Sequence, residues 1–177
     1  MTPLLGGAFD PPHNGHVALA AAVRERFGEP VILVTADPGH KATVASAEDR
    51  LALARAAFPG YRVELDEHAR TVDLLRAGRF SDPLVVIGAD EYRDFPTWKE
   101  PLEVARLARL AVATRPGFPV EGDVEQLEVQ PVPVASRELR ALVADGESID
   151  AFVPPAVADL IRARGLYVGS HGYTESS

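Results

Sequence analysis

Short apolar runs alternate with amphipathic stretches along nearly the whole chain, and this alternation constrains the fold more than any other feature. Strands that are buried on both faces of a parallel sheet read as continuous apolar runs, without the polar alternation of half-exposed strands. Five such runs cover residues 3–6, 31–35, 61–65, 84–88 and 110–113, and a weaker one covers 127–132. We therefore predict a mostly parallel sheet.

Helical patterns fill the intervals between these runs. They cover residues 16–27, 47–58, 71–77 and 101–108, and two more at 136–145 and 154–164 close the chain. Repeated strand–helix units with right-handed crossovers give a doubly wound, Rossmann-like α/β sheet, whose ligands bind at the C-terminal ends of the strands. We predict one domain over residues 1–167 and a polar, flexible tail over 168–177.

Composition excludes several classes of protein. The chain has 177 residues and no cysteine, so disulfides and thiolate zinc sites are excluded. No apolar run approaches the roughly 20 residues of a membrane span. The first residues lack the basic region and apolar stretch of a secretion signal, so we expect none. A net charge of −8 argues against general nucleic-acid binding. We expect a cytoplasmic protein without membrane or nucleic-acid partners. Its oligomeric state is left open, a homo-oligomer included.

Residues 6–16 read Gly-Gly-Ala-Phe-Asp-Pro-Pro-His-Asn-Gly-His and join the first apolar run to the first helix. Such a junction offers backbone N–H groups and a positive helix end to a phosphate. His13 and His16 flank the helix start, where imidazole donors can stabilise charge on a transferring phosphoryl group. Capping or packed histidines are the simpler alternative. A metal site is another, although only Asp10 accompanies the pair and the spacing crosses a loop. We favour an anion site.

Two later segments suit nucleotide and ligand binding. Gly88 and Asp90 directly follow the fourth run, and a carboxylate there can accept hydrogen bonds from ribose hydroxyls. A simple turn is the alternative. Trp98 is the only tryptophan and lies in a polar loop, which suits stacking on a ligand, with a core anchor as the alternative. Ser136 can cap the helix it opens, and Arg140 can reach back to a phosphate at that helix end.

Together these segments resemble the bacterial nicotinate mononucleotide adenylyltransferase family, within the nucleotidyltransferase superfamily that carries the H-x-G-H signature. Residues 6–16 match its longer pattern G-G-x-F-D-P-x-H-x-G-H, and G-A-D followed after five residues by P-T-W recurs at 88–98. Related pantetheine-phosphate adenylyltransferases usually have Thr in place of His13. The likeness extends in order from Gly6 to Tyr167. It implies transfer of AMP from ATP to nicotinate mononucleotide, with Mg²⁺ accompanying ATP and pyrophosphate released.

The resemblance also implies roles for individual residues. Catalytic roles fall to His13, His16 and Arg140. Nucleotide contacts are expected at Gly6, Gly7, Phe9, Gly88, Asp90 and Ser136. Acceptor contacts are expected at Lys41, Arg50, Arg70, Thr71 and Trp98, with the tryptophan stacked on the pyridine ring. No residue is expected to ligate a metal directly.

Departures from the family pattern cluster around the acceptor and the triphosphate. Gly39 replaces the second proline of a P-P-H-K loop, and Arg70 stands where tyrosine is usual. Ala135 and Arg137 occupy hydroxyl positions before and within the later helix. Two alternatives follow. A specialised paralogue would transfer AMP or CMP to another small phosphorylated or phosphonylated acid, and a catalytically silent module would only bind nucleotide.

Overall fold

One parallel sheet organises the molecule, which is described over residues 1–39 and 42–169 by a computed structural model. The strand order is β3-β2-β1-β4-β5-β6, and every neighbouring pair is parallel. The strands are β1 Thr2–Gly7, β2 Val31–Thr35, β3 Arg62–Asp66, β4 Pro83–Gly88, β5 Arg109–Thr114 and β6 Glu125–Glu128. The order reverses direction at β1, so the predicted doubly wound sheet is confirmed.

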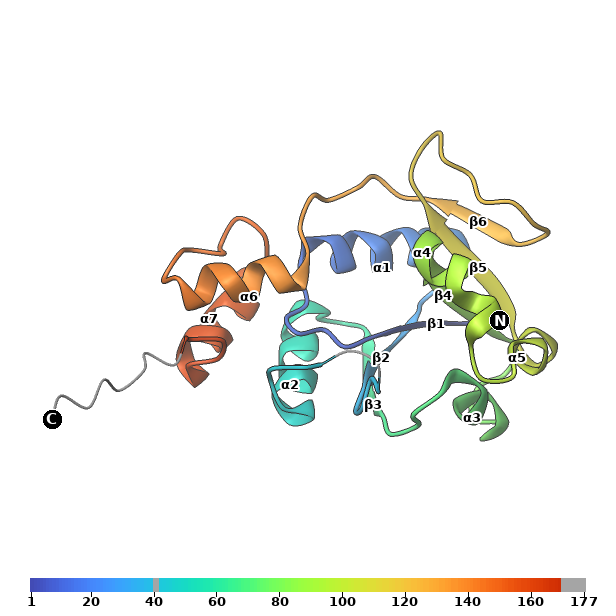
Figure 1. The fold of residues 1–177 in the computed structure, drawn as a ribbon, viewed down its shortest axis with the longest axis horizontal. Helices are drawn as coiled ribbons and strands as arrows, with labels where there is room; N and C mark the ends of the chain where they lie inside the picture. The colour runs from blue at the N-terminus through green and yellow to red at the C-terminus, as the bar shows by residue number, and fades with distance from the viewer. Residues whose placement is uncertain (40–41, 170–177) are drawn as a thin grey trace, which may run out of the picture.

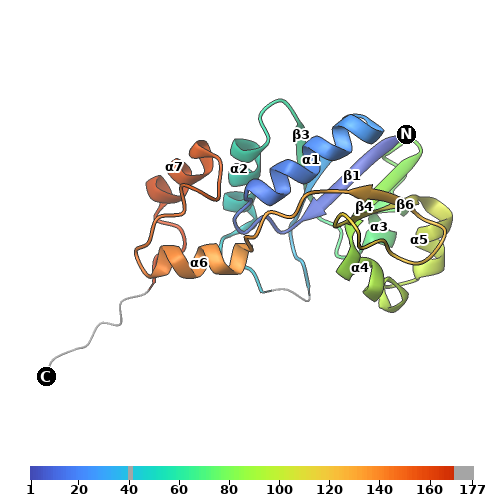
Figure 2. The ribbon, with the colours of Figure 1, turned by 90° about the horizontal axis from the view of Figure 1, so that it is seen from above.

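Helices cover both faces of this sheet, as Figures 1 and 2 show. They are α1 Asn14–Phe27, α2 Ala47–Ala57, α3 Thr71–Arg76, α4 Ala89–Asp94, the 3₁₀ turn η1 Phe95–Thr97, α5 Pro101–Leu107, α6 Ser136–Ala144 and α7 Pro155–Arg164. Helices α1, α2, α6 and α7 contribute to one apolar cluster, and α3 and α5 contribute to the other. Figure 2 shows α6 and α7 at the opposite end of the molecule from α5.

Alternate residues of each central strand feed the two clusters. Leu4 and Leu33 pack with α3 and α5, whereas Leu5 and Ile32 pack with α1 and α2. Both faces of the strand are therefore apolar, which is the physical reason why these runs show no polar alternation. Among the described residues, no helix has the length and apolar character needed to cross a membrane.

Two elements differ from the sequence prediction. Helix α4 follows Gly88, where no helix was predicted, and the Glu91 carboxylate accepts a hydrogen bond from the Gly88 N–H at 2.9 Å and so caps the helix start. Strand β6 ends at Glu128 instead of reaching residue 132. Pro131 and Pro133 follow it and lack the N–H groups that a continued ladder would use.

Candidate active site

The two histidines of the first junction form a hydrogen-bonded cap at the start of α1. His13 is the N-cap residue, and its Nδ1 accepts the Gly15 N–H at 3.0 Å. Nδ1 of His16 accepts the His13 backbone N–H at 3.1 Å, and the two ring centroids lie 3.8 Å apart. Because each Nδ1 accepts a hydrogen bond, the proton of each neutral imidazole is on Nε2. The cap therefore fixes the orientation of both imidazole rings at the start of α1.

Gly15 is a part of this site that sequence reasoning did not single out. An added Cβ would lie 2.8 Å from Cε1 and 2.9 Å from Nδ1 of His13. That separation is too short for any side chain, so glycine is what allows the His13 ring to close over the helix start. The position of this glycine between the two histidines of the motif is the sequence signal that could have identified it as part of the site.

Phe9 supports His16 from the protein interior. Its side chain is 2% exposed, and its ring centroid lies 5.1 Å from that of His16 and 5.6 Å from that of Phe58. Gly7 makes room for this ring, because a Cβ there would lie 3.1 Å from it. The packing indicates that the Phe9 ring supports His16, and the nucleotide contact expected of Phe9 stays a prediction.

Asp10, in the loop between β1 and α1, forms hydrogen bonds with two segments that are distant in sequence. Its Oδ2 accepts the Val44 N–H at 2.7 Å, and its Oδ1 accepts the Ala45 N–H at 3.1 Å and the Tyr167 hydroxyl at 2.7 Å. Burial, together with this bond to a carboxylate, raises the pKa of the Tyr167 hydroxyl above its usual range, so it stays a donor. The Asp10 carboxylate is thus committed to the protein, which disfavours the metal-site alternative.

Helix α6 is tied to the junction by two of the predicted residues. Arg140 Nη1 donates to the Asp10 backbone carbonyl at 2.8 Å, and the Ser136 hydroxyl donates to the Pro11 carbonyl at 2.7 Å. Ser136 does not cap α6 as expected, because the N-cap residue is Ala135. The Arg140 side chain remains 23% exposed beside the histidine cap. The structure therefore brings a guanidinium and two imidazoles to one end of the sheet.

The glycines expected to contact nucleotide lie on neighbouring strands. Gly6 and Gly7 end β1, Gly88 ends β4, and these two strands pair directly. Gly6 is exposed, so backbone can approach a ligand there. Asp90 lies one residue into α4 with its side chain 90% exposed, and it pairs with Arg93. A ribose would have to displace that surface ion pair.

Arg50, which was expected to contact the acceptor, is buried inside the protein. Its side chain is 1% exposed, and burial lowers the pKa of the guanidinium. It donates hydrogen bonds to the backbone carbonyls of Ala45 at 3.2 Å, Ala8 at 3.0 Å, Thr35 at 2.7 Å and Ala36 at 2.8 Å. These bonds hold the segments that follow β1 and β2 against α2. The geometry favours a supporting role over contact with the acceptor.

The remaining acceptor residues surround the first turn of α3. Thr71 opens that helix and Arg70 is its exposed N-cap residue. Trp98 is half-buried, with its ring centroid 5.3 Å from that of Phe95. Lys99 Nζ lies 3.1 Å from the Asp73 carboxylate and so links the tryptophan loop to α3. Lys41 lies outside the described residues.

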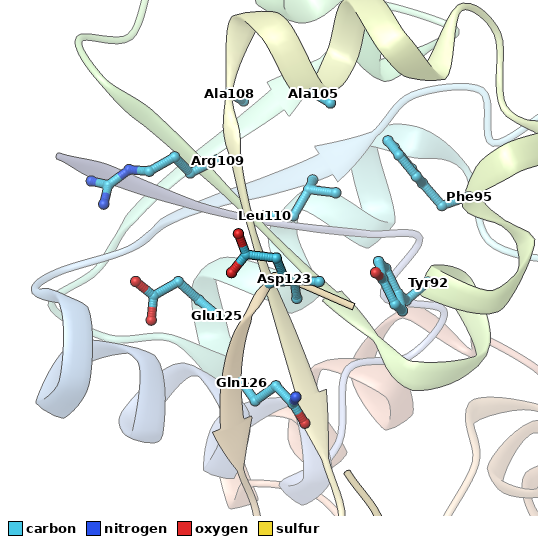
Figure 3. A pocket seen from close by; sticks show the side chains of 10 residues that line it. Tyr92, Phe95, Ala105, Ala108, Arg109, Leu110, Asp123, Glu125 and Gln126 are labelled. Atoms are coloured by element: carbon cyan, nitrogen blue, oxygen red, sulfur yellow. The ribbon is translucent and has the colours of Figure 1, made fainter. Parts of the chain in front are cut away.

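A separate cavity of about 700 Å³ opens beside β5 and β6 (Figure 3). Tyr92 and Phe95 face it from one side, and Asp123 and Glu125 lie across from them (Figure 3). The strand residues in its lining include those that begin β5 and β6, and the lining contains none of the predicted site residues. In a doubly wound sheet the ligand edge is the C-terminal one. We therefore place the candidate active site at the histidine cap.

The histidine cap predicts a specific acid dependence of stability. Burial lowers the pKa of His13 from 6.5 to about 4. Between those values the unfolded chain binds a proton that the folded protein excludes, so stability should fall as the pH drops from 6.5 toward 4. Urea unfolding across this range tests the point. His13→Asn keeps a side-chain oxygen for the cap and should show a shallower decline. An unchanged slope in that variant would contradict the buried, neutral histidine.

Comparison with known proteins relates this geometry to a family. The family model described as cytidylyltransferase-like matches residues 4–168. A protein of Thermus thermophilus named "Probable nicotinate-nucleotide adenylyltransferase" is 38% identical over an aligned length of 181 positions, which covers 93% of this chain and 97% of that protein. A Chlorobaculum parvum protein of the same name is 34% identical over 191 residues, covering 94% and 98% of the two chains.

A solved structure agrees at the level of the fold. The Plasmodium falciparum nicotinic acid mononucleotide adenylyltransferase complexed with NaAD superimposes with a TM-score of 0.76 at 15% identity, covering 94% of this chain and 96% of the other. The family match spans almost the whole described chain, including the histidine cap and Arg140. The predicted family is therefore confirmed: this chain belongs to the cytidylyltransferase-like family, among the nicotinate-nucleotide adenylyltransferases.

Proposed function

We propose that this enzyme transfers AMP from ATP to nicotinate mononucleotide and releases pyrophosphate. The observation that carries the proposal is the convergence of the His13 and His16 imidazoles and the Arg140 guanidinium at the ligand edge of the sheet. The relatives named nicotinate-nucleotide adenylyltransferase support the choice of acceptor. We expect the reaction to run in the cytoplasm, because ATP is the donor. The chain also has no cysteine and so cannot form the disulfides typical of proteins in oxidising compartments.

The reaction needs no protein nucleophile. A phosphate oxygen of the acceptor attacks the α-phosphorus of ATP, a new P–O bond forms, and the bond from that phosphorus to the bridging oxygen of pyrophosphate breaks. The electron pair leaves with pyrophosphate, and because the attacking phosphate is already anionic, no proton has to be removed from it. Catalysis then rests on holding the two phosphates in line and stabilising the charge that develops.

Each residue of the histidine cap has a distinct task in this scheme. His13 is neutral near pH 7, since burial lowers its pKa to about 4, so it acts as a hydrogen-bond donor and not as a cation. His16 donates from the neighbouring ring. Arg140 carries the positive charge and is held toward the site by the Asp10 carbonyl. Together they would stabilise the triphosphate and its departing pyrophosphate.

Mg²⁺ enters this proposal as part of the nucleotide substrate. The described part of the chain contains no group of three or more histidine, cysteine or acidic side chains that could hold a metal. Magnesium commonly keeps several waters and binds through substrate phosphates, which fits a site built from donors and not from carboxylates. The ion would neutralise phosphate charge alongside Arg140.

Pyrophosphate release tests the proposal. Purified protein with Mg²⁺ is given ATP or CTP together with nicotinate mononucleotide, nicotinamide mononucleotide or no acceptor. We expect release with ATP and nicotinate mononucleotide, and none without an acceptor. Release only with CTP, or none with either mononucleotide, would overturn the assignment and favour another small phosphorylated acid.

A further inference from the structure

Gly39 and Arg70 lie against each other, although they come from different loops. A Cβ added at Gly39 would lie 2.8 Å from Nη1 of Arg70, and the same nitrogen donates to the Ala69 carbonyl at 2.9 Å. Gly39 has a φ of +61°, which favours glycine, and its N–H donates to the Asp37 carboxylate at 2.9 Å. The guanidinium of Arg70 thus lies against the turn after β2, in the space that a side chain at position 39 would fill. We call this space the Gly39 cradle.

Arg70 differs from the neighbouring cations because its guanidinium is not paired with a carboxylate among the described residues. Lys99 pairs with Asp73 at 3.1 Å, and Arg76 pairs with Glu100 at 2.6 Å. Within residues 1–39 and 42–169, the Arg70 side chain makes no ion pair, and the only hydrogen bond of its guanidinium goes to the Ala69 carbonyl. An exposed, oriented guanidinium without an internal counter-ion is suited to a ligand anion, and a planar carboxylate matches its paired donors.

The position of Arg70 relates it to the acceptor. The Asp73 N–H donates to the Arg70 carbonyl at 3.1 Å, while the Asp73 carboxylate binds Lys99, the residue after Trp98. One short turn of α3 therefore connects the backbone of Arg70 to the loop that carries Trp98, whose ring is proposed to stack on the pyridine. Arg70 also follows the C-terminal end of β3, at the ligand edge of the sheet.

From this geometry we infer that Arg70, held in the Gly39 cradle, selects acceptors that carry a carboxylate on the pyridine ring over those that carry a carboxamide. This inference rests on the proposed function and deepens it. The carboxylate of nicotinate mononucleotide gains a charge-assisted hydrogen bond, which the neutral amide of nicotinamide mononucleotide cannot provide. The contact is made in both the bound substrate and the transition state, so it acts mainly on KM.

The experiment compares kcat/KM for the two mononucleotides at saturating ATP and Mg²⁺, using the full chain. We expect wild type to prefer nicotinate mononucleotide. In Arg70→Gln the ratio of the two kcat/KM values should fall about tenfold or more, the scale of one charge-assisted hydrogen bond, with kcat little changed. Arg70→Lys should lose less. Arg26→Gln, which removes an exposed arginine from the last turn of α1, should leave the ratio unchanged.

A second pair of variants separates the cradle from the charge. Gly39→Ala keeps the guanidinium but pushes it out of place, so the ratio should fall here too. Gly78→Ala is the matched control, because Gly78 has a φ of +65° and nothing within 4 Å of an added Cβ. It should carry similar backbone strain and keep the wild-type ratio.

The outcomes distinguish the two levels of the proposal. If wild type adenylylates neither mononucleotide, the proposed function fails, and the inference fails with it. If wild type uses nicotinate mononucleotide but Arg70→Gln keeps the ratio, only the inference is overturned. Equal losses on both acceptors would also overturn it, because they would assign Arg70 to the phosphate that the acceptors share.

Discussion

Replacing His16 with alanine is expected to lower kcat by about 10²-fold or more, the scale for losing one preorganised donor to a developing charge. Such a donor needs a fixed tautomer and a fixed orientation, and the His16 ring has both. Phe9 packs against it at 5.1 Å between centroids, and the His13 N–H occupies its Nδ1 at 3.1 Å. Nε2–H is therefore fixed in tautomer and orientation before the substrate binds. Steady-state kinetics with ATP and nicotinate mononucleotide measure the effect.

Asn14→Ala provides the control for damage to the helix start. Asn14 lies in the same turn, and among the described residues its side chain donates only to the Ala151 carbonyl, at 3.3 Å. This variant should keep kcat near the wild-type value, with a similar small change in melting temperature. A His16→Ala enzyme with full kcat and only a raised KM would mean that the ring binds the ground state and the transition state equally.

Replacing Arg50 with methionine is expected to destabilise the fold by about 3 kcal/mol or more, because buried carbonyls lose their donor. Methionine fills similar space, so the change reports mainly the lost hydrogen bonds to Ala8, Thr35, Ala36 and Ala45. For a domain of this size, that loss lowers Tm by about 10 °C. Thermal and urea unfolding both measure it.

Arg55→Met is the matched control, since Arg55 lies on the same helix with an exposed side chain. Its unfolding should resemble that of wild type. If Arg50→Met instead kept its Tm and raised only the KM for nicotinate mononucleotide, then Arg50 would contact the acceptor, as the sequence resemblance implied.

The elements of the fold were largely predictable because their signals are local. Each apolar strand and the β1–α1 junction can be recognised from a continuous stretch of sequence, and each corresponds to an observed element. Helix α4 was missed because its cap is formed by Glu91 reaching back to Gly88, and a glycine-led turn has the same sequence pattern.

The burial of individual site residues could not be predicted in the same way. A phenylalanine and an arginine within a ligand-binding motif look alike in sequence whether they face the ligand or the interior. Phe9 is 2% exposed and Arg50 is 1% exposed, because the chain folds back over both from segments distant in sequence. The partnership of Gly39 with Arg70 likewise joins loops that only the β2–β3 pairing brings together.

The central claim is that the histidine cap directs attack at the α-phosphorus of ATP, and isotope transfer tests it most directly. Nicotinate mononucleotide is incubated with the enzyme, Mg²⁺ and ATP labelled at either the α- or the γ-phosphorus, and the products are separated. We predict that the α-label appears in the dinucleotide and the γ-label in pyrophosphate, and that His16→Ala slows both transfers equally. Transfer of the γ-label to the mononucleotide would show phosphoryl transfer instead and would contradict the account.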